Sequence, residues 1–410
     1  MTKPHLLMVG GWKELIEKAL AVGHRVSFVG DTTAAQWRDG WLEHNCLSVH
    51  HASVEQISTC LVHARALHRE HPLDAVVSFT EYGLETAAVI ADALGVKGLP
   101  LRPVALTRYK DGMRAVLDTV PELALRWRKV GTGAELREFW EQHGPELILK
   151  PLAGAGSEGV YEIKNARDLA EAEENPDWQG EVPYLTERFV PGDRLYSVET
   201  VTRGGEHRTV AVTMAKLIGD PCTVNNYLML PPPPPYDQHA ERLSAAAHRL
   251  LDAIGLEWGC AHTELKVDVD GRAVVIESQT RVGGQGISRM IEWSTGLPNI
   301  DAVLAELTGQ WIELGAPEGR VSVAFSLVVP GGRVHAVADP KVLDAIPEVV
   351  DHEIRIEAGA ELSETVDNSS RHGLVWLTAD THEQLFAGMR AVCDNYWVEF
   401  DDGQLWHPSF

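Results

Sequence analysis

The chain has 410 residues, 44% of them hydrophobic, which is enough for two to four domains with substantial cores. Its formal net charge of −23 argues against nucleic acid or an anionic membrane as a general partner, although a local basic nucleotide pocket stays compatible with it. The five cysteines form no Cys-x-x-Cys pair, which is typical of a reducing cytoplasm and predicts no zinc site. Without a signal-peptide pattern or a long apolar run, we expect a cytoplasmic protein with no membrane span.

The first hundred residues alternate between apolar strands and amphipathic helices. This alternation predicts a parallel sheet with helices on both faces. Gly10-Gly11 follows the first strand but lacks the third glycine of a dinucleotide fingerprint, so we expect a scaffold and part of a substrate wall here. The expected strands are 6–9, 25–29 and 75–79, and the expected helices are 12–21, 54–69 and 84–94.

Two lysines mark the next segment. Lys110 stands at the start of a helix, and Lys150 ends a buried-looking strand over 147–151. The run Gly154-Ala155-Gly156-Ser157-Glu158-Gly159 follows, and the backbone amides of such a loop can wrap phosphates. It is not a P-loop, because the Gly-Lys-Ser/Thr ending is absent. A purely structural turn is the alternative, and the strand-end lysine favours phosphate binding.

An antiparallel sheet is predicted beyond residue 183, with strands over 184–190, 195–201 and 209–216 and a helix over 239–254. Between them, residues 219–235 lose periodicity and end in five prolines. We expect a lid or pocket wall in this irregular segment, with Asn226 and Tyr227 as candidate substrate contacts.

The clearest pattern is a pair of alternating arms that flank Asp270-Gly271, which predicts a hairpin with a two-residue turn. Such a turn pairs Val269 with Arg272 and places Glu264 directly opposite Glu277. Side chains in a strand alternate between faces. One face therefore carries Glu264, Glu277, Gln279 and Arg281, and the other carries Ile276, Ser278 and Thr280.

The two opposed carboxylates of this hairpin have a chemical consequence. They lie roughly 4.5–5.5 Å apart at Cβ and repel unless one is protonated, water enters or a cation lies between them. Mg²⁺ prefers oxygen ligands, and Gln279 adds an amide oxygen. Arg281 supplies a fork for a phosphate or carboxylate. The alternative is an exposed polar hairpin face.

Residues 320–410 are predicted to form a separate α+β unit. The expected strands are 321–328, 334–338, 374–377 and 397–400, with a helix over 382–395. Arg371 lies in the polar turn 369–373, where a solvated arginine is favoured over one that contacts a ligand.

In their order and spacing, these motifs resemble those of the ATP-grasp superfamily, specifically carboxylate–amine ligases such as the L-amino-acid ligases. Lys110, Lys150 and the loop 154–159 look like the phosphate lysines and the mobile glycine-rich loop. The 13-residue step from Glu264 to Glu277 looks like the magnesium and reaction-centre motif. The family usually has Asn where this chain has Gln279, which keeps the amide oxygen but adds a methylene and leaves the preferred metal open.

The resemblance implies roles for individual residues. Phosphate binding falls to Lys110, Lys150, Gly154, Gly156, Ser157 and Gly159. Adenine binding falls to Glu187, Arg188, Phe189 and Val190, and ribose binding to Asp193 or Glu199. Catalysis falls to Arg281, Lys150 and Ser157, and metal binding to Glu264, Glu277 and Gln279. Substrate contacts fall to Arg281, Gly283, Gly284, Gln285 and, more weakly, Arg289.

The resemblance also implies an architecture and a reaction. The fold expected is an α/β and α+β ATP-grasp fold with four parts: an N-terminal α/β domain, a small and a large subdomain holding ATP, and a C-terminal α+β domain, over residues 1–102, 103–183, 184–315 and 316–410. A carboxylate, expected to be an amino acid or a derivative, would attack ATP, and an amine would then attack the acyl phosphate to give an amide or dipeptide, ADP and phosphate. ATP with Mg²⁺ or Mn²⁺ is expected.

Two other functions stay open. One is an ATP-grasp carboxylase or a carrier-protein-acylating ligase. The other is a non-catalytic ATP-binding regulator, suggested by Gln279 and opposed by the retention of both lysines, both glutamates and Arg281. Dimers are common in the family, so a homodimer is a further option.

Overall fold

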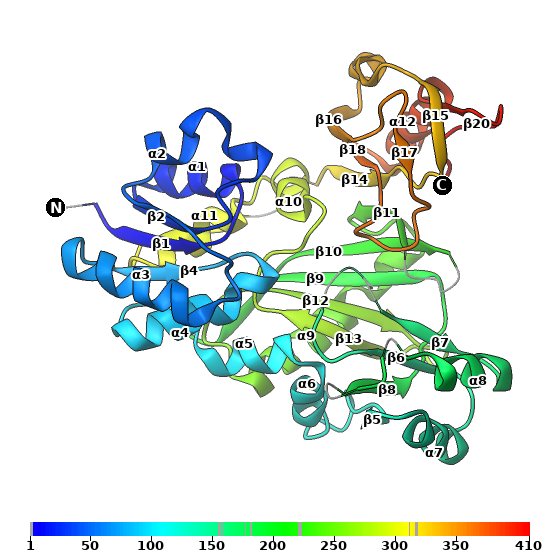
Figure 1. Cartoon of the computed structure of the whole chain (residues 1–410), viewed down its shortest axis with the longest axis horizontal. Coiled ribbons are helices and arrows are strands. Elements are labelled where there is room, and N and C mark those ends of the chain that lie inside the picture. The colour runs from blue at the N-terminus through cyan, green and yellow to red at the C-terminus, as the bar shows by residue number, and fades with distance from the viewer. Residues whose placement is uncertain are drawn as a thin grey trace.

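The computed structural model describes residues 3–154, 156, 159–176, 178–180, 183–219, 224–310, 312–315 and 319–410. Among these residues, the structure contains no helix with both the length and the apolar character needed to cross a bilayer. Figure 1 shows an N-terminal domain, a small subdomain and a C-terminal unit grouped around one large sheet.

The N-terminal domain contains the predicted parallel sheet, in the order β3-β2-β1-β4. The short turn η2 (Glu81–Gly83) follows β4 closely, so it lies at the carboxyl edge of the sheet. The strands are β1 (His5–Val9), β2 (Arg25–Gly30), β3 (Val49–His51) and β4 (Ala75–Val77). The helices are α1 (Lys13–Val22), η1 (Ala35–Gly40), α2 (Trp41–Asn45), α3 (Ile57–Glu70) and α4 (Leu84–Leu94).

The small subdomain is an antiparallel sheet in the order β5-β8-β6-β7. It packs Leu136, Phe139 and Trp178 into a core of its own. Because β8 pairs with β5 and β6, this sheet extends past the predicted boundary at residue 183. The elements are α5 (Leu101–Arg108), α6 (Lys110–Leu117), β5 (Trp127–Val130), α7 (Gly133–His143), β6 (Leu147–Pro151), β7 (Tyr161–Ile163), α8 (Ala166–Glu174) and β8 (Tyr184–Arg188).

The large sheet has eight strands in the order β13-β12-β9-β10-β11-β14-β18-β16. Helix α9 packs Leu243, Leu250 and Ile254 into its main core. The strands are β9 (Arg194–Arg203), β10 (Glu206–Ile218), β11 (Val224–Leu230), β12 (Trp258–Val267), β13 (Ala273–Gln279), β14 (Val321–Ser326), β16 (Val349–Ile354) and β18 (Gly373–Ala379). The helices are η3 (Tyr236–His239), α9 (Ala240–Ile254), α10 (Ile287–Thr295) and α11 (Asn299–Glu306).

Two predictions are corrected by this sheet. Strand β11 occupies much of the segment expected to be irregular, and it pairs with both β10 and β14. The C-terminal unit is not separate, because β14, β18 and β16 continue the large sheet. A second sheet, in the order β17-β15-β19-β20, is formed entirely by strands of the C-terminal part. Its region contains β15 (Gly332–Val337), η4 (Pro340–Ala345), β17 (Glu361–Leu362), α12 (His382–Asn395), β19 (Val398–Phe400) and β20 (Leu405–Trp406).

Candidate active site

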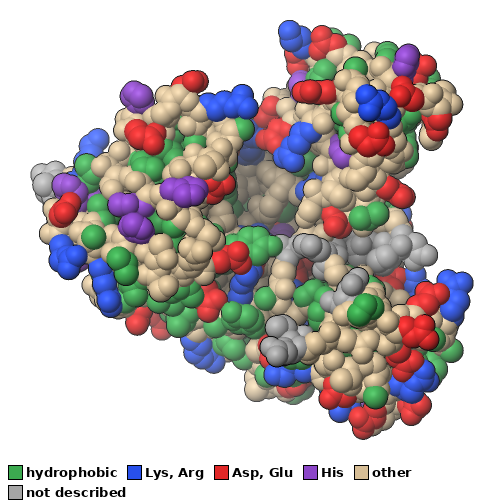
Figure 2. All heavy atoms as spheres, viewed as in Figure 1, with side chains coloured by type: hydrophobic (Ala, Val, Ile, Leu, Met, Phe, Trp, Pro, Cys, Tyr) green, Lys and Arg blue, Asp and Glu red, His purple; other side chains and the backbone are tan. Residues whose placement is uncertain are grey.

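A cavity of about 380 Å³ opens between the small subdomain, the large sheet and the C-terminal part. Figure 2 shows the molecule deeply hollowed between its lobes. Residues far apart in the sequence meet at this cavity, from Lys110 to Arg371. Its lining contains these predicted site residues: Lys110, Lys150, Gly154, Gly156, Glu187, Arg188, Phe189, Val190, Glu264, Glu277, Gln279, Arg281, Gly284 and Gln285.

The hairpin places Glu264 directly opposite Glu277, and this predicted pairing is confirmed. The predicted turn is wrong. Gly271 N donates to Asp268 O at 2.9 Å, and the Asp268 carboxylate accepts from the backbone N–H groups of Asp270 and Arg272. Because Asp268 also donates to Arg272 O, the loop has three residues, with Gly271 at φ 76°.

The longer loop alone would shift the pairing of the two strands by one residue. A β-bulge restores the register at Glu264 and Glu277. The ladder steps by one residue between Glu264 and Leu265, which leaves Ile276 unpaired on β13. Both residues around a bulge can turn toward one face, and Ile276 accordingly lines the cavity beside Glu277. The prediction that Ile276 points away is therefore wrong, whereas Ser278 is buried and hydrogen-bonds Thr263 at 2.9 Å.

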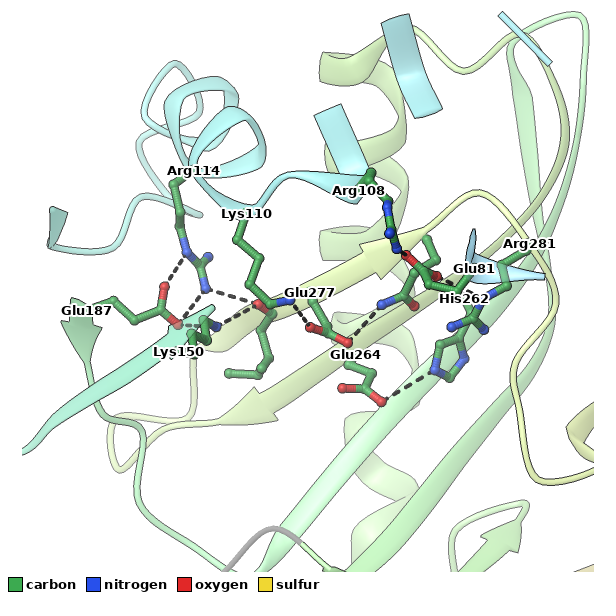
Figure 3. Close-up of polar contacts among 12 residues, drawn as sticks. Glu81, Arg108, Lys110, Arg114, Lys150, Glu187, His262, Glu264, Glu277 and Arg281 are labelled. Carbon is green, nitrogen blue, oxygen red and sulfur yellow. Dashed lines mark hydrogen bonds and ion pairs between the residues drawn. The ribbon is translucent and has the colours of Figure 1, made fainter. Parts of the chain in front are cut away.

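Two lysines reach the acidic side chains of the cavity (Figure 3). Lys110 Nζ lies 3.1 Å from Glu277 Oε2, and Lys150 Nζ lies 2.6 Å from Glu187 Oε1. Burial disfavours the charged form of Glu277, but Lys110 and Lys150 outweigh it and lower the pKa of this carboxyl to about 2. Glu277 is therefore ionised at neutral pH and can act as an anionic ligand.

Glu187 is held by a partner that the sequence did not indicate. Arg114 is fully buried and donates two hydrogen bonds to the Glu187 carboxylate, at 2.6 and 3.0 Å. The same guanidinium donates to the carbonyl oxygens of Val275 and Ile276. Glu187 was expected at the adenine; it lines the cavity, and its carboxylate accepts hydrogen bonds from Arg114 of α6 and Lys150 of β6. A signal was available: Arg114 lies four residues after Lys110, on the same side of a helix.

Gln279 is oriented toward the carboxylates. Its Nε2 donates to Glu277 Oε1 at 2.8 Å, and its Oε1 is buried without a hydrogen-bond partner among the described residues. A buried acceptor without a partner costs free energy that a bound cation would recover. Glu264, Glu277 and this amide oxygen form a donor set that fits a hard divalent cation.

Arg281 contacts a carboxylate from the N-terminal domain. Its Nε donates to Glu81 Oε2 at 3.0 Å, and Glu81 Oε1 accepts from Arg108 Nη1 at 3.1 Å (Figure 3). Sequence reasoning missed Glu81 and Arg108. The available signal was the position of Glu81 just after β4, where the carboxyl ends of parallel strands gather ligands.

His262 also escaped prediction. It lines the cavity, with Nδ1 2.6 Å from Glu199 Oε1 and Nε2 3.4 Å from Glu264 Oε1. Burial disfavours its charged form, but Glu199 and Glu264 raise the pKa of this imidazole to about 10. The sequence did contain a signal, because His262 lies two residues before Glu264 on the same strand.

Other predicted residues lie elsewhere. Neither candidate ribose ligand lines the cavity: Glu199 is buried against His262 and Ser197, and Asp193 is paired with Lys216 and Arg194. Among the lining residues that are described, Gly159 and Gly283 are also absent. Gly283 has a packing role, because an added Cβ would lie 2.6 Å from the Ile287 side chain. Ser157 lies outside the described residues.

The three remaining substrate candidates, Asn226, Tyr227 and Arg289, are not among the described residues that line the cavity. Tyr227 packs in the main core, and a register shift between β10 and β11 leaves Asn226 unpaired. From the same strand, Asn225 and Leu228 line the cavity. Arg289 bridges Glu14 of α1 and Asp351 of β16, at 3.2 and 2.9 Å, and lies over Trp376. Arg289 thus joins the N-terminal domain to the C-terminal part.

Comparisons with known proteins agree with this geometry. Residues 16–100 match the ATP-grasp N-terminal domain, and residues 144–289 match the ATP-grasp domain. The chain therefore belongs to the ATP-grasp superfamily. In the C-terminal part, residues 326–400 match the L-amino acid ligase C-terminal domain 2.

Individual relatives are more distant. The chain is 25% identical to uncharacterized protein y4rH of Sinorhizobium fredii, over 75% of this chain and 64% of that protein. It is 28% identical to an alanine–anticapsin ligase of Bacillus subtilis, over 56% of this chain and 51% of that enzyme. The chain thus spans about half to two thirds of the length of these curated relatives. A crystal structure of an L-amino acid ligase from Bacillus licheniformis has the same fold, with a TM-score of 0.84, 20% identity and coverage of 98% of this chain and 99% of that chain.

Proposed function

We propose that the chain is an ADP-forming ligase that joins a carboxylate to an amine through an acyl phosphate. The observation that carries this proposal is the convergence of Lys110, Lys150, Glu277 and Arg281 on one cavity. Phosphoryl transfer to a carboxylate requires cations to balance the phosphates and a site that limits water. The lysines and Arg281 of this cavity supply the cations, and the domain matches of the chain favour this reaction over a carboxylase or a carrier-acylating enzyme.

Phosphate binding is proposed for the two lysines. Each now contacts a carboxylate, Lys110 at Glu277 and Lys150 at Glu187, so each is held beside the cavity without an anion from outside the chain. Burial and the nearby cations Arg114 and Lys110 lower the pKa of Lys150 against the opposing effect of Glu187. A triphosphate would stabilise the protonated form of both lysines. The backbone of Gly154 and Gly156, which also lines the cavity, is proposed to contact phosphate oxygens.

Metal binding is proposed for Glu264, Glu277 and Gln279. The unpartnered Gln279 Oε1 and the ionised Glu277 are the features that fit a divalent cation. Bound there, Mg²⁺ would neutralise phosphate charge during transfer. Lys110 would then exchange its contact with Glu277 for one with a phosphate.

The substrates are proposed to lie on the Arg281 side of the cavity. Arg281 would stabilise the acyl phosphate and the oxyanion formed when the amine attacks it, and Glu81 would hold Arg281 in place. Gly284 and Gln285 follow Arg281 and line the cavity. We propose amino acids or their derivatives as substrates, in line with the L-amino acid ligase domain match and the alanine–anticapsin ligase relative.

Adenine binding is proposed for Arg188, which ends β8, and for Phe189 and Val190, which follow it; all three line the cavity. Their position at the end of the small sheet suits a hinge between the two subdomains.

A ligation screen tests the proposed function. The purified chain is incubated with ATP, Mg²⁺ and pairs of the twenty standard amino acids, phosphate release is measured, and products are identified by mass spectrometry. We expect release that depends on a particular pair, with one amide formed per ADP. Phosphate release that no amino-acid pair stimulates would refute an amino-acid ligase.

A further inference from the structure

Arg371 reaches the cavity from the C-terminal part of the chain, just before β18. The sequence favoured a solvated turn arginine at this position, and the structure overturns that prediction. Arg371 is largely buried, and its Nη1 has no hydrogen-bond partner among the described residues. A buried guanidinium N–H group without a partner is unfavourable, so it is either a cost to the fold or part of a prepared anion site.

The loop that carries Arg371 is held by several hydrogen bonds. The Asp367 carboxylate accepts the backbone N–H groups of Ser369 and Ser370, at 2.8 and 2.7 Å. Asn368 Oδ1 accepts from Asn225 N at 2.9 Å. Asn368 N donates to Gly156 O at 3.2 Å, so the loop is tied to both β11 and the glycine-rich loop. Hydrogen bonds within the turn and to β11 therefore position the backbone that carries Arg371 beside the cavity.

The surroundings of Arg371 provide little balancing charge. Burial, together with the neighbouring Arg355, lowers the pKa of Arg371 to about 10, and Asp367 acts in the opposite direction. The group still carries its charge at neutral pH, and an anion in the cavity would stabilise it.

Two buried acceptors share this cavity with Arg371. Gln285 Oε1 and Asn225 Oδ1 have no hydrogen-bond partner among the described residues, and both residues line the cavity. Gln285 is also held at φ 56°, a conformation that costs free energy for a residue other than glycine. Carbonyl oxygens without donors repel a phosphate but suit an ammonium group. The cavity thus combines an unpaired cation with unpaired acceptors, which matches a zwitterion.

We infer that Arg371 binds the free α-carboxylate of the amine substrate, with Gln285 and Asn225 accepting hydrogen bonds from its ammonium group. The acceptor is then an α-amino acid and not a simple amine. This inference rests on the proposed ligase function, in which one carboxylate is consumed by phosphorylation and the other is retained in the product. The retained carboxylate needs a cation of its own, because Lys110 and Lys150 are assigned to phosphates.

Four proteins test this inference: the wild type, Arg371→Met, Arg371→Lys and the control Arg355→Met. Arg355 is an exposed neighbour of Arg371 that is absent from the described cavity lining. Ligation is measured at saturating ATP and donor, with the acceptor supplied as the amino acid found in the ligation screen or as its carboxamide. Loss of a charge-assisted hydrogen bond predicts a KM for the free amino acid that rises roughly 10- to 100-fold in Arg371→Met. The KM for the carboxamide and for ATP should change less than about twofold, and Arg371→Lys should recover part of the loss.

Each outcome separates the alternatives. An equal loss with the carboxamide, or a raised KM for ATP alone, would overturn the inference, since the arginine would then bind a phosphate. A marked fall in melting temperature for Arg371→Met would also overturn it, because an arginine without partners should be replaceable by Met without loss of stability. Absence of ligation by the wild-type protein would instead refute the proposed function, and this inference with it.

Discussion

Replacing Arg114 with Met should destabilise the chain strongly, although Arg114 lines no part of the cavity described. The variant leaves the buried Glu187 carboxylate with Lys150 alone and removes donors from two backbone carbonyls. Removing one partner of a buried ion pair costs about 3–5 kcal/mol of the free energy of unfolding. Urea denaturation followed by circular dichroism measures the loss, and hydrogen exchange of the β8 amides localises it.

The matched control is Arg128→Met. Arg128 also pairs with a glutamate, Glu138, at 2.8 Å, but the two side chains are 37% and 55% exposed. Exposed pairs contribute about 1 kcal/mol or less. The reasoning would be refuted if Arg114→Met lost no more stability than Arg128→Met.

The pH dependence of the Arg114→Met variant gives a second measurement. Burial disfavours ionised Glu187, but Arg114 and Lys150 outweigh it and lower its pKa in the folded protein. A lowered pKa contributes stability above the unfolded value of about 4.3, and this contribution is lost as pH falls through the folded pKa. In the variant the pKa of Glu187 rises, so protonation relieves its burial. The stability gap between wild type and variant should therefore be smaller at pH 4 than at pH 7, and an equal or wider gap at pH 4 would contradict this account.

Substitutions at three further residues test the proposed centre. Glu277→Gln should lower kcat by about 10²-fold or more, because the ionised ligand is lost; retained phosphate release would contradict the metal assignment. Gln279→Leu should raise the Mg²⁺ concentration for half-maximal activity by roughly 10- to 100-fold, whereas Gln279→Asn keeps an amide oxygen and should raise it less; equal Mg²⁺ curves would remove Gln279 from the site. Glu81→Gln should lower kcat by up to about 10²-fold through a misplaced Arg281, and an unchanged kcat would show that Arg281 needs no support from the N-terminal domain.

Much of this fold could be predicted from local patterns, because apolar residues recur with the period of the strand or helix that contains them. The parallel sheet of the N-terminal domain and the pairing of Glu264 with Glu277 are examples. The pairing of Glu264 with Glu277 was predicted correctly from a turn of the wrong length. The extra loop residue and the bulge at Ile276 shift the strand register by one residue each, and the two shifts cancel. A bulge leaves no reliable signal in alternating hydrophobicity, and the same kind of register shift moved Asn225, not Asn226, into the cavity.

Contacts between distant elements could not be predicted. Glu81 reaches Arg281 across 200 residues, and Arg114 reaches Glu187 across 73. No local spacing records such pairs, because the fold alone brings them together. The burial of Arg371 could not be predicted for the same reason. A serine-rich turn indicates a solvated position, but this turn packs against β11.

The continuity of the eight-stranded sheet has a consequence for how the chain acquires its structure during synthesis. Strand β11 ends at residue 230, and its neighbour β14 begins only at residue 321. A ribosome adds about 5–20 residues per second, so several seconds pass between the synthesis of β11 and the synthesis of β14, which pairs with its edge. In that interval the unpaired edge of β11 is open to strands of other nascent chains. A fragment that ends near residue 315 should therefore aggregate, even though it contains the residues proposed to bind the nucleotide.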